Sequence, residues 1–240
     1  MLLRLDNLDV FHHDGTPAVR GVSFALAPGE RVGLIGPNGA GKSSLLLAVM
    51  NGLHFHGGIT IDGIELSRRT AADARGRCGL VFQDADDQLF MPTLLEDVAF
   101  GPLNQNMDAS AAAAHARAAV AAVGLAGLEN KSAHHLSGGQ KRVAAIATVL
   151  AMRVKLLLLD EPAANLDVRS RRRLIDLLAA RDEAMLLASH DMDMVERLCT
   201  RVIVLDEGLL IADGPTRAIL ADTALLTRHG LMEEAVDRRL

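Results

Sequence analysis

The amino-acid sequence predicts an α/β fold: a mixed β-sheet with an antiparallel β part at its beginning and an α-helical lobe inserted in the middle. Three observations predict this arrangement. The first 35 residues alternate short apolar runs with turn residues, the middle is rich in Ala, and from residue 154 onward apolar runs alternate with helical stretches. Strands that alternate with helices are typical of a largely parallel sheet covered on both faces.

Composition excludes several classes of protein. The chain has 240 residues, of which 50% are apolar, so it can bury a large core and is neither disordered nor a disulfide-stapled miniprotein. Its net charge of −5 and its lack of Trp and Tyr argue against a nucleic-acid partner. The only cysteines, Cys78 and Cys199, lie too far apart for a disulfide framework or a zinc knuckle, which favours a reducing compartment.

The first part of the chain is expected to be mainly β-structure. Its apolar runs are bounded by turn residues, as at residues 14–17. The expected strands are 2–10, 19–26, 31–35, 58–61 and 79–82. A glycine-rich loop at 36–41 separates the third strand from a helix at 42–52.

The middle is expected to be a helical lobe over residues 84–150. Ten of the fifteen residues from Ala109 to Val123 are Ala, the strongest helix former. Asp108 is suited to cap this helix at its beginning and Gly124 to end it.

The second part returns to alternating strands and helices. The expected strands are 154–159, 184–188, 202–205 and 209–212, with helices through 172–179 and at 192–198. The last twenty residues are expected to form one or two helices. No apolar run approaches the ~18–20 residues that span a bilayer.

A phosphate-binding loop is predicted at residues 36–43. The segment GPNGAGKS matches G-x-x-x-x-G-K-[ST] and lies between an expected strand and an expected helix. Its glycines let backbone N–H groups surround phosphate oxygens, Lys42 supplies a charge to the β and γ phosphates, and Ser43 offers a hydroxyl to Mg²⁺. The candidate binding residues are Gly36, Asn38, Gly39, Ala40, Gly41, Lys42, Ser43 and Ser44.

Two acidic residues end the most apolar strand. Asp160 and Glu161 follow four consecutive leucines, and the carboxyl end of such a strand opens at the ligand crevice of this fold class. Asp160 is the candidate Mg²⁺ holder, and Glu161 is the candidate base for an attacking water.

A second anion site is predicted at residues 136–140, LSGGQ. Ser137 is suited to cap the following helix, and Gly138 and Gly139 leave its first N–H groups uncovered. One chain would then carry two phosphate-binding surfaces.

These motifs together resemble those of the ATP-binding-cassette ATPases. The resemblance covers about residues 1–220 and implies the RecA-like P-loop NTPase fold, with ATP and Mg²⁺ bound. It also implies a head-to-tail homodimer, in which each ATP lies between one phosphate loop and the partner's Ser137–Gln140 segment. The domains would be a nucleotide-binding core at 1–83 and 151–221, a helical signature lobe at 84–150, and a helical tail at 222–240.

Further positions of the family pattern occur in order. Gln83 resembles the glutamine that senses Mg²⁺ and the γ-phosphate and couples to the membrane partner. The segment Asn165–Asp167 resembles the loop that crosses the dimer interface, although Asp167 is equally suited to cap a helix. His190 resembles the histidine that contacts the γ-phosphate.

One departure concerns adenine. The family commonly stacks an aromatic residue, often Tyr, on the base, whereas this chain has His12 at that place, with Phe11 beside it. Imidazole offers less stacking area. The histidine pairs 12/13, 54/56 and 134/135 are scattered over three segments, so we interpret them as solvated loop residues rather than metal ligands.

The segment from Gln83 to Phe90, with acids at 84, 86 and 87, resembles that of energy-coupling-factor importers. The continuation at 92–104 is closer to the cobalt/nickel branch than to the vitamin branch. The resemblance implies an integral membrane scaffold and a substrate-specificity subunit as partners, on the cytoplasmic face of the membrane. The acids could meet a basic helix of the scaffold or simply be solvated. The alternatives are a vitamin importer, for example of biotin, or a non-transport cassette ATPase.

Overall fold

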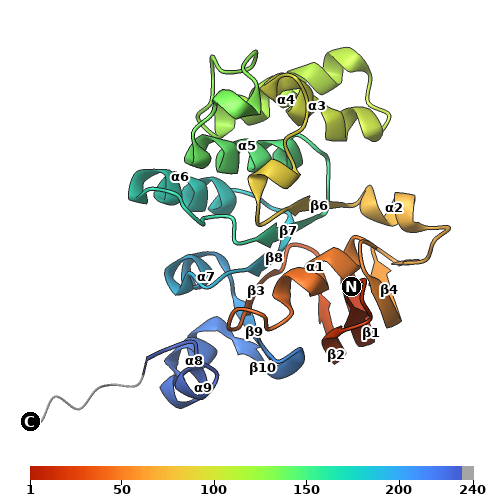
Figure 1. Cartoon of the computed structure of the whole chain (residues 1–240), viewed down its shortest axis with the longest axis vertical. Coiled ribbons are helices and arrows are strands. Elements are labelled where there is room, and N and C mark those ends of the chain that lie inside the picture. Colours follow the sequence, from red (N-terminus) through yellow and green to blue (C-terminus); the bar gives the residue numbers. More distant parts are fainter. Residues whose placement is uncertain (234–240) are drawn as a thin grey trace, which may run out of the picture.

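The computed structural model describes residues 1–233 and contains two β-sheets and a helical lobe (Figure 1). The strands are β1 (Leu3–Phe11), β2 (Pro17–Leu26), β3 (Arg31–Ile35), β4 (His54–Ile61), β5 (Ile64–Glu65), β6 (Cys78–Val81), β7 (Leu156–Asp160), β8 (Ala184–Ala188), β9 (Arg201–Asp206) and β10 (Leu209–Pro215). The helices are α1 (Lys42–Val49), α2 (Ala71–Arg75), α3 (Leu94–Asn104), α4 (Ala109–Ala122), α5 (Gly138–Leu150), α6 (Val168–Ala179), α7 (Met192–Leu198), α8 (Thr216–Ala221) and α9 (Thr223–Arg228), with short 3₁₀ turns η1 (Ala85–Asp87) and η2 (Ala133–His135).

The larger sheet has six strands in the order β10-β9-β3-β8-β7-β6. Its strands from β9 to β6 are parallel, and β10 pairs with β9 in the antiparallel direction. Because β3 and β7 are parallel and both next to β8, the loops that follow them emerge at the same sheet edge. The phosphate loop and the acidic pair are therefore brought together by topology.

The smaller sheet is antiparallel, in the order β2-β1-β4-β5. It lies with α1 on one face of the larger sheet, while α6, α7, α8 and α9 lie on the other face (Figure 1). Alternate residues of the central strands serve the two cores. Leu156 and Leu158 of β7 pack toward α1, whereas Leu157 and Leu159 pack toward α6 and α7.

The lobe formed by α3, α4 and α5 has a third core of small and branched side chains. The Ala-rich helix α4 begins where the sequence predicts, because the Asp108 carboxylate accepts hydrogen bonds from the N–H groups of Ser110 and Ala111, both at 3.0 Å. Ala112, Ala116 and Val120 share its buried face.

The predicted α/β class, mixed sheet, antiparallel beginning and inserted helical lobe are confirmed. Several details differ. Strand β4 begins at His54 rather than residue 58, helix α1 ends at Val49 rather than residue 52, and the short elements β5 and α2 lack a sequence signal long enough to predict them. The end of the predicted C-terminal helical region, residues 234–240, lies outside the described residues.

No helix within residues 1–233 combines the length and apolar character needed to cross a membrane.

Candidate functional site

A cleft of about 580 Å³ lies at the sheet edge where β3 and β7 end. Predicted residues from four segments line it: His12, Asn38, Gly39, Ala40, Gly41, Lys42, Ser43, Ser44, Gln83, Asp160 and Glu161. Unpredicted residues of the β1–β2 turn and Glu207 complete the lining. The phosphate loop, the acidic pair and Gln83 therefore share one cleft, as the sequence predicts.

The phosphate loop is held against neighbouring backbone, which accounts for two of its glycines. A Cβ on Gly36 would lie 2.2 Å from the carbonyl oxygen of Leu205, and one on Gly41 would lie 2.4 Å from that of Ala18. Gly41 also has a φ of 99°, in the left-handed region, and it directly precedes helix α1. Only glycine fits these two positions without displacing the chain.

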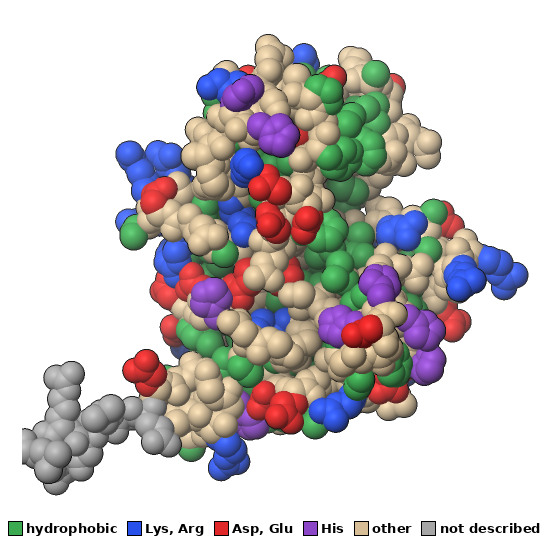
Figure 2. Space-filling view, in the orientation of Figure 1, with side chains coloured by type: hydrophobic (Ala, Val, Ile, Leu, Met, Phe, Trp, Pro, Cys, Tyr) green, Lys and Arg blue, Asp and Glu red, His purple; other side chains and the backbone are tan. Residues whose placement is uncertain are grey.

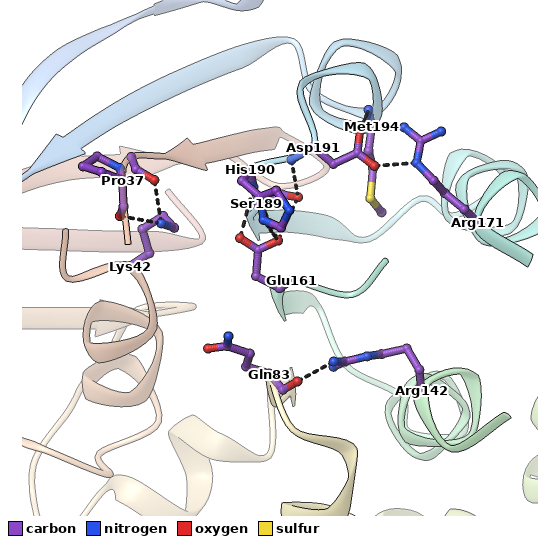
Figure 3. Close-up of polar contacts among 11 residues, drawn as sticks. Pro37, Lys42, Gln83, Arg142, Glu161, Arg171, Ser189, His190, Asp191 and Met194 are labelled. Atoms are coloured by element: carbon purple, nitrogen blue, oxygen red, sulfur yellow. Dashed lines mark hydrogen bonds and ion pairs between the residues drawn. The ribbon is translucent and has the colours of Figure 1, made fainter. Parts of the chain in front are cut away.

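Lys42 is buried at the beginning of α1, and its side chain turns back over the loop. Its ammonium donates hydrogen bonds to the carbonyl oxygens of Gly36 at 2.7 Å and Pro37 at 3.0 Å (Figure 3). Burial lowers the pKa of Lys42, and the nearby carboxylates of Glu161 and Asp160 oppose this shift. Within residues 1–233 the cation is thus held by backbone carbonyl oxygens rather than by a salt bridge.

Asp160 has the properties expected of a cation ligand. It is only 6% exposed, and its Oδ1 atom has no hydrogen-bond partner among residues 1–233. Burial raises its pKa, and a hydrogen bond with Ser43 partly offsets this effect. A buried carboxylate oxygen without a partner, beside a hydroxyl, offers the hard oxygen ligands that Mg²⁺ prefers. The residues present therefore fit the predicted ion.

Glu161 is fixed from the end of the neighbouring strand β8. Its backbone has a φ of 46°, which L residues rarely adopt, and its N–H donates to Ala188 at 2.9 Å. The carboxylate accepts from the N–H of His190 at 3.0 Å and from the hydroxyl of Ser189 at 3.3 Å. The His190 Nδ1 atom lies 2.8 Å from Oε2 (Figure 3). His190 thus reaches the candidate base directly.

A salt bridge fixes the loop that carries His190. Arg171 of α6 pairs with both carboxylate oxygens of Asp191 and contacts Asp193 at 2.8 Å. This pairing holds the pKa of Asp191 below its ordinary value. Arg171 is half-buried and paired, so it is not part of a solvated basic face of α6.

Gln83 follows β6 and lies at the rim of the cleft. Its carbonyl oxygen and that of Phe82 accept hydrogen bonds from Arg142, while its side-chain amide points away from Arg142 (Figure 3). Arg142 belongs to α5 and is 6% exposed, and burial lowers its pKa. Helix α5 therefore controls the position of Gln83 through the backbone.

The predicted second anion site lies elsewhere on the chain. Ser137 caps α5 in a reciprocal arrangement: its backbone N–H donates to the Gln140 side chain at 2.9 Å, and its hydroxyl accepts from the Gln140 N–H at 3.3 Å. A Cβ on Gly138 would meet nothing within 4 Å, so this helix end is open. Ser137, Gly139 and Gln140 line a separate pocket with Asp167. They do not line the Lys42 cleft of their own chain.

His12, the candidate adenine-stacking residue, lies at the β1–β2 turn and lines the cleft. Phe11 points elsewhere: its ring packs at 5.2 Å from that of His56, on β4.

Asp167 caps helix α6, because its carboxylate accepts hydrogen bonds from the N–H groups of Arg169 and Ser170. This is the helix-capping role that the sequence allowed for Asp167.

Sequence reasoning missed Ser189, Arg142 and Gln88. The Gln88 side chain accepts from the Phe82 N–H at 3.1 Å and donates to Ala145 and Thr148 of α5, at 2.9 and 2.6 Å. Ser189 directly precedes His190, which the sequence predicts. Arg142 lies two residues after the predicted second anion site at residues 136–140. No residue pattern distinguishes Gln88 from the solvated acids around it.

Comparisons with known proteins agree with this site. A family model described as "ABC transporter" matches residues 19–164. An ABC transporter ATP-binding protein of Streptomyces coelicolor, whose name gives no cargo, is 46% identical over 231 residues, covering 95% of this chain and 88% of the relative. The cobalt import ATP-binding protein CbiO of Rhodobacter capsulatus is 42% identical over 223 residues, covering 90% and 80%.

Among solved structures, CbiO1 of Clostridium perfringens, part of the ABC transporter complex CbiONQ, has a TM-score of 0.79 and 33% sequence identity, covering 97% of this chain and 95% of that one. The family match covers more than half of the chain, and the structural match extends over nearly all of it. The chain therefore belongs to the ABC transporter family and is one of its ATP-binding, ATP-hydrolysing cassettes.

Proposed function

We propose that this cassette is the ATP-hydrolysing subunit of a cobalt or nickel importer of the energy-coupling-factor type, acting as a head-to-tail homodimer on the cytoplasmic face of the membrane. One observation carries the hydrolytic part: Lys42, Gln83, Asp160 and Glu161, which come from three separate segments, face one cleft. Each provides a chemical group that phosphoryl transfer to water needs.

In the proposed reaction, the loop N–H groups and Lys42 bind the β and γ phosphates. Asp160, Ser43 and Gln83 would hold Mg²⁺, which neutralises developing phosphate charge when bound. Glu161 accepts a proton from the attacking water, and its carboxylate is kept in place by Ser189 and His190. His190 is 69% exposed at its side chain and can turn toward a γ-phosphate.

The dimer is supported by the separation of the two anion sites within one chain. The open N-terminus of α5 at Ser137 lies outside the cleft that holds Lys42. A second copy in head-to-tail orientation would bring its Ser137 to that cleft, where the helix N-terminus is suited to bind the γ-phosphate. Asp167, which lines the same pocket as Ser137, would then lie at the interface.

A docking surface for the membrane scaffold is supported by apolar side chains beside the cleft. Phe90, Phe100 and Leu103 are 63%, 40% and 46% exposed. The two Phe rings pack edge to face at 5.1 Å. A groove of about 470 Å³ is lined by Leu47, Gln83, Asp84 and Asp87, among others, and the last three of these precede Phe90 in the same segment of the chain. Figure 2 shows apolar and acidic side chains where the lobe meets the rest of the molecule. A helix with an apolar face and a basic end fits this surface.

The cargo is inferred from the acidic segment after Gln83 and from the similarity to the cobalt import protein CbiO. It is tested by expressing the chain with its membrane partners and measuring uptake of cobalt, nickel and biotin by cells. ATP-dependent accumulation of cobalt or nickel would support the proposal. Accumulation of biotin with neither metal would support the vitamin importer instead.

The hydrolytic proposal is tested by Glu161→Gln. Removal of the base should lower kcat for ATP by about 10²–10⁴-fold, with ATP affinity kept. ATP turnover and nucleotide binding are measured on the purified chain. Asp206→Asn serves as a control, because Asp206 pairs with His229 at 2.7 Å and does not line the cleft. Normal turnover by Glu161→Gln would contradict the proposal.

A further inference from the structure

Two histidines converge on the outer face of the small sheet. His54 and His56 lie two residues apart on β4, so their side chains leave the strand on the same face. Both residues are exposed, and their Nε2 atoms are 3.2 Å apart. Figure 2 shows histidine side chains gathered on the side where Figure 1 places β1, β2 and β4. These two histidines are therefore strand residues, not the solvated loop residues that the sequence suggests.

The separation of the two nitrogens is that of a chelating pair. Two imidazole nitrogens bound to one metal ion at ~2.0–2.1 Å, at tetrahedral or right angles, are about 2.9–3.4 Å apart. The observed 3.2 Å lies within this range. It also requires that one Nε2 carry no proton, because two protonated nitrogens would repel each other. A metal ion bound to both nitrogens would take the place of the single proton between them.

The pair is held in this arrangement by its neighbours. The Phe11 ring on β1 lies 5.2 Å from the His56 ring and 6.0 Å from the His54 ring. Gly57 next to His56 has a φ of 93°, and a Cβ there would lie 2.3 Å from the carbonyl oxygen of Asn7. This close approach fixes the end of β4 against β1. The backbone that carries His56 is therefore fixed before a metal ion binds.

We propose that His54 and His56 form a binding site for a divalent first-row transition-metal ion that prefers imidazole, of the series from Co²⁺ to Zn²⁺. Within residues 1–233 no cluster of three or more His, Cys, Asp or Glu could hold a metal, so water completes the coordination. The pair does not line the Lys42 cleft, so this site is separate from the proposed Mg²⁺ site and independent of the proposed cargo.

The test is calorimetric titration of the untagged full-length chain with Ni²⁺. We expect one ion per chain to bind with micromolar affinity. His54→Gln and His56→Gln should each weaken binding at least about tenfold, because one imidazole instead of two would then hold the ion. The double variant His134→Gln/His135→Gln is the matched control and should bind as the unmodified chain does. Absence of binding, or unchanged binding in both strand variants, would overturn the proposal.

A second measurement uses the unmodified chain and so does not depend on how the variants fold. Substoichiometric Ni²⁺ is paramagnetic in a site completed by water and broadens the NMR signals of the rings that bind it. The signals of His54 and His56 should broaden before those of the other histidines. Earlier broadening at any other histidine would place the metal elsewhere and refute the assignment.

Discussion

Asp160 and Glu161 are adjacent in sequence, yet their carboxylates have opposite surroundings. In the part of the chain that the structure describes, one oxygen of Asp160 has no hydrogen-bond partner, whereas Glu161 accepts from His190 and Ser189. The oxygen of Asp160 that has no partner is available to bind a cation. The Glu161 carboxylate is oriented by its two donors and is available to accept a proton from a water molecule. The sequence predicts both residues and their separate roles, but not the hydrogen bonds that distinguish them, which depend on where β8 ends.

The environment of Asp160 predicts how stability varies with pH. Burial raises its pKa in the folded chain, so the ionised form disfavours folding above that pKa and protonation relieves the penalty below it. Asp160→Asn should therefore raise the free energy of unfolding near neutral pH, by on the order of 1 kcal/mol. The gain should shrink as the pH falls through the raised pKa.

Urea unfolding without Mg²⁺, at neutral and at acidic pH, measures this difference. Glu207→Gln is a suitable control, because Glu207 lines the same cleft and its side chain is not part of the acidic pair. If Asp160→Asn instead lowers the free energy of unfolding by the same amount at both pH values, the raised pKa of Asp160 does not govern this pH dependence and the prediction is refuted.

At the scale of elements, helix α5 joins the lobe to the cleft. Its Arg142 donates to the carbonyls of Phe82 and Gln83, its Lys141 pairs with Asp86 at 2.6 Å, and its residues 145 and 148 accept from Gln88. The open Ser137 end belongs to the same helix. A movement of α5 would thus displace the segment after Gln83 together with the second anion site.

This connection predicts the effect of Gln88→Ala. The variant loses the bonds to Phe82, Ala145 and Thr148, so its free energy of unfolding should fall by about 2 kcal/mol. ATP turnover should fall about tenfold, because Gln83 loses its support. Asp108→Ala is the matched control: loss of the α4 cap costs about 1 kcal/mol but leaves turnover unchanged. Thermal unfolding and ATPase assays measure both; normal turnover in Gln88→Ala would contradict the role of α5.

How far the sequence predicts the elements depends on the length and apolar character of each segment. Strand β7 is four leucines and an acid, and α4 is mostly Ala, so both are predicted within a few residues. The strand β5 and the five-residue α2 are too short to show a period. The early start of β4 is missed because His54 and His56 are polar, although Phe55 between them packs against the core.

Among the candidate site residues, those in contiguous motifs are predicted and those joined only by tertiary contact are not. Lys42 and Ser43 follow from the glycine loop alone. Arg142 and Ser189 act through backbone and side-chain contacts with Gln83 and Glu161, which depend on how α5 and β8 pack.

At the scale of the whole molecule, the two proposed phosphate-binding surfaces of one chain line separate pockets. We propose that residues 84–150 move as a lobe relative to the core at 1–83 and 151–221, so that ATP draws two chains together and hydrolysis releases them. The membrane partner would follow this movement through the exposed Phe90 and Phe100.

The central claim is that Ser137 of one chain completes the Lys42 cleft of another. The most direct measurement is the molar mass of the Glu161→Gln chain by light scattering, with Mg²⁺ and ATP. The account predicts that the molar mass doubles when ATP is added. It predicts no doubling when the Glu161→Gln chain also carries Ser137→Arg, although this chain should still bind a fluorescent ATP analogue at its own Lys42. A Glu161→Gln chain that stays monomeric, or a Ser137→Arg chain that still doubles, would contradict the account.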